Sequence, residues 1–203
     1  SLRMRNEFAM GLSYYYQGMY EKALDHMGIA LNIAENNYSW RFVVETLSVT
    51  SHIHLAKGKT YSSFECIQNA LNLAKGYQFT GLHSVLIYAE GKIHLAFGNY
   101  QQAVKLFDEA LRFVTHDRGV LINQSWRLFA KALLGEHEEG IRQIEKIRLD
   151  AIKRQWIEAW IKASTHLGLI LYLSGKIEDS LKVLQEVGQK AEELGFAAAG
   201  TAF

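Results

Sequence analysis

Residues 98–111, with the sequence GNYQQAVKLFDEAL, decide the fold of this chain. A glycine, a polar residue and a tyrosine are followed by apolar residues at Ala103, Phe107 and Ala110, which have the spacing of one face of a helix. Glycine is the usual residue just past a helix end. The stretch therefore predicts a tight turn that leads into an amphipathic helix.

The same turn and helix pattern occurs five times along the chain. Its turn glycines, at intervals of 40, 40, 37 and 40 residues, are Gly18, Gly58, Gly98, Gly135 and Gly175. A fixed period of this size is typical of stacked repeat proteins, in which each unit packs on its neighbours. The sequence therefore predicts an all-α solenoid, a superhelix of about five helix-turn-helix repeats that forms a single domain over 1–203. We place the repeats at 2–37, 38–77, 78–118, 119–152 and 153–195, with 196–203 as a candidate start of a sixth.

The 37-residue interval marks the fourth unit as less regular than the others. Its second helix also carries Gly140 where the other units carry alanine or serine. We expect a tighter unit at this point and a bend in the stack.

Composition narrows the classes of function. The 203 residues contain 22 Lys and Arg against 21 Asp and Glu, so the net charge of +1 gives no electrostatic reason to expect nucleic acid or an anionic membrane as a partner. No segment approaches the roughly 18 uninterrupted apolar residues of a membrane span. The single cysteine, Cys66, cannot form an internal disulfide, and the absence of proline suits an almost wholly helical chain. We therefore expect a cytoplasmic protein.

The C-terminal residues 196–203, FAAAGTAF, are apolar and lack the polar outer face that ends a solenoid. They lie in phase with the starts of earlier units. We expect either that the chain continues in a longer array or that this end docks on another surface, including that of a second copy.

The phased pattern resembles the tetratricopeptide repeat (TPR), whose signature combines Leu-Gly-x2-Tyr in the first helix with Ala-x3-Phe in the second. The matching residues of three units are Met10, Gly11, Tyr14, Tyr20, Ala23, Met27 and Ala30; Gly91, His94, Tyr100, Ala103, Phe107 and Ala110; and Leu167, Gly168 and Leu184. The period is longer than the family's 34 residues, and its closing proline is missing.

Longer units of this kind are similar to the sensor arrays of bacterial regulators, such as maltose-regulator-like activators and quorum-sensing peptide receptors.

The sequence offers no recognisable set of catalytic or metal-binding residues. His52 and His54 are two residues apart, so on a helix they point to different faces and cannot hold one metal ion together. No phosphate-binding loop, dinucleotide fingerprint or Gly-x-Ser-x-Gly motif occurs. We expect neither an enzyme nor a bound metal or cofactor; a histidine acting as a general base is the weakest of the alternatives.

The resemblance to TPR proteins implies that the first helices of the units line a concave groove that binds ligands. The phase of the repeats then selects the candidate contact residues Arg5, Phe8, Leu12, Tyr15, Glu45, Ser48, His52, Tyr88, Lys92, Ser125, Phe129, Lys162 and Thr165. Aromatic anchors with a few charged and hydroxyl groups suit a peptide or a helix as ligand. Within this set, Arg5, Lys92 and Lys162 could form a basic ladder for an acidic tail or a carboxylate.

The function that these observations favour is a non-enzymatic protein- or peptide-binding module, the interaction or sensory segment of a larger bacterial regulatory protein. The alternative is the small-molecule effector domain of a transcription regulator, with its pocket near His52, Tyr88 and Phe129. In both cases the ligand would act by shifting the curvature of the superhelix or its contact with other domains.

Overall fold

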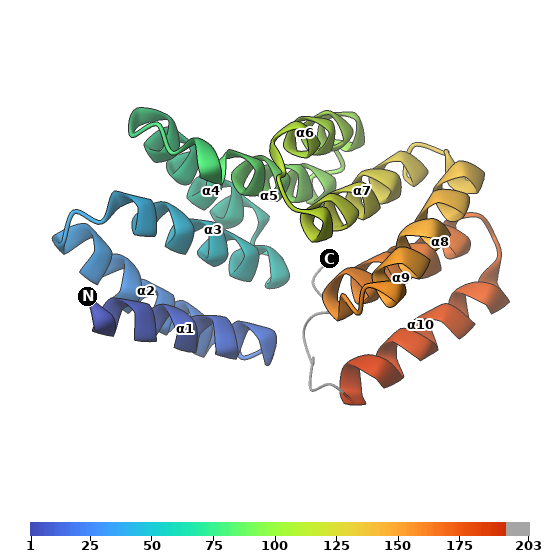
Figure 1. The fold of residues 1–203 in the computed structure, drawn as a ribbon, viewed down its shortest axis with the longest axis horizontal. Coiled ribbons are helices and arrows are strands. Elements are labelled where there is room, and N and C mark those ends of the chain that lie inside the picture. Colours follow the sequence, from blue (N-terminus) through green and yellow to red (C-terminus); the bar gives the residue numbers. More distant parts are fainter. Residues whose placement is uncertain (194–203) are drawn as a thin grey trace.

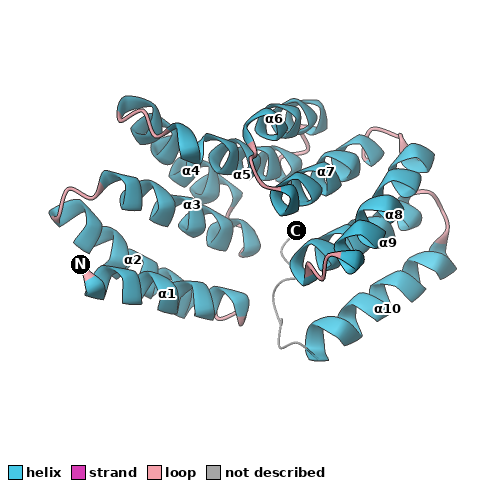
Figure 2. Ribbon diagram, viewed as in Figure 1, coloured by secondary structure: helices cyan, strands magenta, loops and turns pink. Residues whose placement is uncertain are grey.

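The computed structural model describes residues 1–193 and shows an array of helices joined by short loops, without strands in that range (Figure 2). Its ten α-helices are α1 (Leu2–Tyr16), α2 (Tyr20–Asn36), α3 (Trp40–Ala56), α4 (Thr60–Gly76), α5 (His83–Ala96), α6 (Tyr100–Phe113), α7 (Asp117–Ala132), α8 (His137–Lys153), α9 (Ile157–Leu173) and α10 (Ile177–Glu193); a short 3-10 helix, η1 (Thr80–Leu82), precedes α5. The predicted all-α class is confirmed. Residues 196–203, on which the predictions of a sixth repeat and of self-association rest, lie outside the described range.

The turn glycines lie where the sequence predicted them, in the connections α1–α2, α3–α4, α5–α6, α7–α8 and α9–α10. Each has a positive φ, between 71° and 101°. A side chain would be strained in this left-handed region, so glycine is favoured at these turns. The repeated glycines thus set the short turn inside each helix pair.

Small residues let the paired helices approach closely, as the repeat pattern implied. A Cβ built on Gly91 of α5 would lie 2.8 Å from the ring of Phe107 in α6, and one on Gly168 of α9 would lie 2.6 Å from Leu184 in α10. Both distances are shorter than real Cβ contacts, so these two positions have no room for a larger residue. Phe107 and Ala103 are fully buried at this contact in the third pair.

The irregularity in the period lies earlier than we predicted. Helix α6 has 14 residues, whereas α2, α4, α8 and α10 each have 17, so the missing turn is at the end of the third pair rather than inside the fourth. Three other connections between pairs contain a non-glycine residue of positive φ, Tyr38, Gln78 or Gln155, but the α6–α7 connection does not. There Val114 is extended, and the His116 ring accepts a hydrogen bond from Gly119 N at 2.9 Å to cap α7.

The helices follow one another around an open arc, with α1 at one end and α9 and α10 at the other (Figure 1). The arc curves enough for its ends to interact electrostatically, since the carboxylate of Glu158 in α9 is one of the charges that raise the pKa values of Tyr15 and Tyr16 in α1, after burial. Helices α1, α3, α5, α7 and α9 therefore face a common interior. No helix in the described part of the chain is long and apolar enough to cross a membrane.

Candidate functional site

The inner helices bring together a group of aromatic and basic side chains from α3, α5, α7 and α9. We call this group the inner cluster; its members are His52, Tyr88, Lys92, Trp126, Phe129, Glu158, Lys162 and His166. Five of them were predicted as contact residues from the phase of the repeats. The inner cluster is the candidate functional site.

Aromatic rings connect the four helices. The Tyr88 ring lies 6.4 Å from that of His52 and 6.5 Å from that of Trp126, measured between centroids. The His166 ring lies 4.4 Å from the Trp126 ring and stacks on Phe129 at 5.0 Å with an interplanar angle of 6°. Contacts of this kind are each worth roughly 0.5–1.5 kcal/mol beyond area burial, so they give the surface a fixed shape.

Lys92 contacts this aromatic surface at Trp126. Only 6% of the residue is exposed, and its Nζ lies 4.8 Å from the centroid of the Trp126 ring, in position for a cation–π interaction. Among residues 1–193, the ion pairs of the structure include neither Lys92 nor its neighbours Lys162 and Glu158. A buried ammonium without a paired carboxylate is costly, so this arrangement requires a functional or structural explanation.

Burial acts on both lysines, and the like charge of Lys162 acts on Lys92. Desolvation, followed by the positive charge of Lys162, lowers the pKa of Lys92 to about 7, and Glu158 only partly opposes this effect. Desolvation also lowers the pKa of Lys162. Glu158 partly offsets the effect of burial at Lys162. An added anion would favour the charged form of both lysines.

The two histidines of the inner cluster are neutral at pH 7. Desolvation, with smaller contributions from Lys92 and Lys162, lowers the pKa of His52 to about 3. The same causes lower the pKa of His166 well below its usual value. With both histidines neutral, Lys92 and Lys162 are the groups of the cluster that carry positive charge.

Ser125 and His166 form a close contact that resembles a catalytic serine–histidine pair. The serine Oγ and the histidine Nδ1 are 2.6 Å apart, but Ser125 is fully buried and His166 is 2% exposed. A nucleophile needs access to its substrate, which this pair lacks. The hydrogen bond instead joins α7 to α9 and fixes the His166 ring against Phe129.

The remaining predicted contact residues lie outside the cluster or have internal roles. Arg5 is exposed on α1, and the Glu45 carboxylate pairs with Arg41 at 3.2 Å. Ser48 is buried, and the Thr165 hydroxyl donates a hydrogen bond to the Ile161 carbonyl at 2.8 Å. The aromatic and aliphatic residues of α1 pack against the neighbouring helices; they are Phe8, Leu12 and Tyr15. Their part in binding stays a prediction.

Sequence reasoning missed Trp126, His166 and Glu158. The repeat phase could have identified Trp126 and His166. Each lies nine residues before the turn glycine of its own unit, Gly135 or Gly175, and directly follows a predicted contact residue, Ser125 or Thr165. Small or aliphatic residues occupy this slot in the other units, so the slot as a whole does not indicate contact residues. Glu158 carried no comparable signal.

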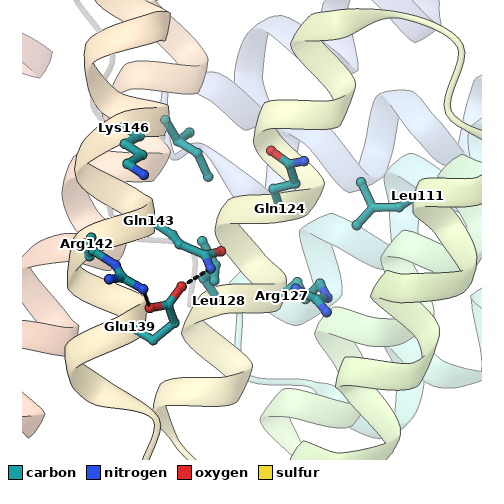
Figure 3. Close-up of a pocket in the computed structure, with 9 residues that line it drawn as sticks. Leu111, Gln124, Arg127, Leu128, Glu139, Arg142, Gln143 and Lys146 are labelled. Atoms are coloured by element: carbon teal, nitrogen blue, oxygen red, sulfur yellow. Dashed lines mark hydrogen bonds and ion pairs between the residues drawn. The ribbon is translucent and has the colours of Figure 1, made fainter.

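A separate pocket of about 370 Å³ lies between α6, α7 and α8 (Figure 3). Its polar lining includes Arg127, Arg142 and Lys146, but Glu139 binds both Arg142 and Gln143, and Asp108 pairs with Arg127. Most of its charge is thus already compensated, unlike that of the inner cluster. In the described range there is no group of three or more histidine, cysteine or acidic side chains that could hold a metal ion.

Comparison with solved structures identifies the architecture. A crystal structure of a kinesin light chain-like protein from Podosopora anserina, described as having nearly identical TPR-like repeats, superposes with a TM-score of 0.62 over 95% of this chain and 96% of that one, at 14% sequence identity. A second crystal structure of the same description gives a TM-score of 0.62 at 15% identity, over 94% and 96% of the two chains.

The fold is a TPR-like helical repeat array. No protein-family model matches the sequence, and no curated protein matches it either. At this level of identity the TPR-like neighbours establish the fold alone, so the function has to be argued from the site.

Proposed function

We propose that this TPR-like array is a non-enzymatic protein- or peptide-binding module whose inner cluster receives an anionic group of the partner. Stacked helical repeats create extended inner surfaces that suit such binding. In this proposal the chain is the interaction or sensory segment of a larger, bacterial regulatory protein in the cytoplasm.

One observation carries the proposal: Lys92 is buried against the Trp126 ring without a paired acid among residues 1–193, and Lys162 acts on it as a second positive charge. Hydrogen bonds to charged groups contribute about 1.5–3 kcal/mol each. A carboxylate of the partner would supply such bonds and remove the repulsion between the two cations. Tyr88 and Phe129 are half-buried beside them and would contact the apolar part of the ligand.

The second candidate function is that of a small-molecule effector domain in a transcription regulator. It is supported by the depth of Lys92, since a single buried ammonium can be reached by a small anion more readily than by a folded partner. The identity of the retained ligand separates the two candidates.

The experiment compares the parent chain with a Lys92→Gln, Lys162→Gln variant as bait for a lysate, with the bound material read by native mass spectrometry. We expect the parent to retain a specific protein, peptide or small anion and the variant to retain at least about tenfold less, because roughly 1.5–3 kcal/mol of charged contacts is lost. A matched control, Lys105→Gln, Lys153→Gln, removes the same charge from exposed positions and should bind like the parent.

Equal retention by the parent and the inner variant would contradict the proposed site. A retained peptide or protein would support the interaction module, and a retained small anion would instead support the effector domain. Circular dichroism of each variant shows that the helices are intact.

A further inference from the structure

The pocket between α6, α7 and α8 lies on the opposite side of α7 from the inner cluster. Helix α7 lines this pocket with Gln124, Arg127 and Leu128. The same helix places Trp126 and Phe129 in the inner cluster. At about 3.6 residues per turn, the two sets of side chains point in opposite directions from the helix axis. A ligand in the pocket therefore would not touch the inner cluster.

We infer that this pocket binds a small monocarboxylic acid with an apolar body, whose carboxylate pairs with Lys146 while the body packs on Leu128 and Ile147. The inference goes beyond the proposed function, because it concerns a second site and needs no protein partner. The pocket volume of about 370 Å³ lies within the range of roughly 300–1,000 Å³ that is typical of small-molecule sites.

The cations of the pocket outnumber the acids that pair with them by one. Arg127 pairs with Asp108 of α6, and Arg142 pairs with Glu139. Lys146 also lines the pocket, and it forms no ion pair within residues 1–193. A single carboxylate would therefore neutralise the charge that remains.

The basic side chains on α8 are open to solvent and can reach one ligand. Lys146 is exposed, and the side chain of Arg142 is 68% exposed. They are four residues apart on one helix, so they share a face of α8. Exposed ion pairs contribute little, so the Arg142 guanidinium can turn from Glu139 to a ligand at small cost. Figure 3 shows Gln124 of α7 on the other side of the pocket, where its amide can donate to the same carboxylate.

Glu139 limits the charge of the ligand to one. Its carboxylate accepts hydrogen bonds from Gln143 and Arg142. The hydrogen bond from Gln143, followed by the charges of Arg142 and Lys146, lowers the pKa of Glu139, so this carboxylate is ionised at neutral pH. A dianion such as phosphate would be repelled by Glu139 and would find one unpaired cation for its two charges. A monocarboxylate has the charge that fits.

Apolar side chains supply the rest of the contact surface. Leu128 and Ile147 are buried and belong to the core between α7, α8 and α9. On the α6 side the wall is Leu111, two residues before this shortened helix ends at Phe113. These side chains suit the hydrocarbon part of a ligand whose carboxylate stays at the polar rim.

The test titrates the full 203-residue chain with 3-phenylpropanoate and with its uncharged amide, 3-phenylpropanamide, and measures binding by isothermal titration calorimetry. We expect the acid to bind the parent chain at least roughly tenfold more tightly than the amide, because the amide lacks the charged contact. Inorganic phosphate should compete with the acid at least roughly tenfold more weakly than unlabelled acid does.

Substitution of Lys146 assigns the bound acid to this pocket. Lys146→Gln should weaken binding of the acid roughly tenfold and leave that of the amide unchanged. The position is exposed and glutamine is a good helix former, so α8 should remain intact. Lys153→Gln removes the same charge from an exposed position of the same helix and should bind the acid like the parent. The Lys92→Gln, Lys162→Gln variant, which alters the inner cluster, should also bind it like the parent.

Three results would overturn the inference or its ligand class. Undetectable binding of the acid to the parent, or equal affinities of the parent and Lys146→Gln, would show that the pocket is not an acid site. Binding that is lost with Lys92→Gln, Lys162→Gln but kept with Lys146→Gln would place the acid in the inner cluster instead. Equal affinities for the acid and the amide, or strong competition by phosphate, would overturn the assignment to monocarboxylic acids. Because the proposed function is tested at Lys92 and Lys162, each proposal can fail without the other.

Discussion

Replacement of Phe107 by alanine is expected to lower the free energy of unfolding by about 3–5 kcal/mol, the range typical of large-to-small changes at buried aromatic positions. The Phe107 ring is fully buried, packs against Gly91 and lies 6.0 Å from the Tyr88 ring between centroids. Removing it leaves a cavity directly behind the inner cluster. Urea unfolding followed by circular dichroism measures the change.

Phe113 provides the control in the same helix. It is 48% exposed, although its ring contacts His83 edge-to-face at 4.7 Å, so Phe113→Ala should cost no more than about 1 kcal/mol. Equal losses for the two variants would contradict the packing described for the third helix pair.

Replacement of Lys92 by methionine is expected to stabilise the chain, although it removes a residue of the proposed site. Burial keeps the folded-state pKa at about 7, below the usual 10.5 of lysine in an unfolded chain. Below pH 7 both states are protonated, and folding then carries the full cost of burying the charge. Substituting buried charges by apolar residues commonly gains about 1–4 kcal/mol, and we expect a gain within that range at pH 6.

The stability difference between Lys92→Met and the parent is expected to depend on pH. Between about pH 7 and 10.5 the unfolded chain holds more protons at Lys92 than the folded one, so the parent gains stability as pH rises. The difference between Lys92→Met and the parent should therefore shrink over this interval. The exposed Lys105→Met serves as the control, with no such gain. A destabilised Lys92→Met variant at pH 6, or a difference that does not change with pH, would show that the charge is compensated.

The architecture could be predicted because repeated structure leaves a repeated signal in the sequence. Gly18, Gly58 and their equivalents occupy turns that require a positive φ, and the small residues at Gly91 and Gly168 are required by close helix contacts. The shortened unit was misplaced for a related reason. A deletion at the end of α6 shifts Gly135, the next marker, so the irregularity was attributed to the fourth pair.

The candidate site could be predicted only in part. The phase of the repeats identifies positions on the inner helices, which is how His52, Tyr88 and Lys92 were found. It cannot show which units face each other, because this depends on the curvature of the whole stack. The positive charge of Lys162 in α9 acts on Lys92 in α5, and neither a motif nor a spacing in the sequence encodes that relation.

The most direct test of the central claim, that the inner cluster holds an uncompensated buried lysine, is an NMR titration of the lysine side chains with ¹³C at Cε. The spectrum of Lys92→Arg assigns the signal. We predict that Lys92 titrates with a pKa of about 7 and that this pKa rises when glutarate or an acidic peptide binds. A Lys92 signal that titrates near 10.5, with all the other lysines, would contradict the account.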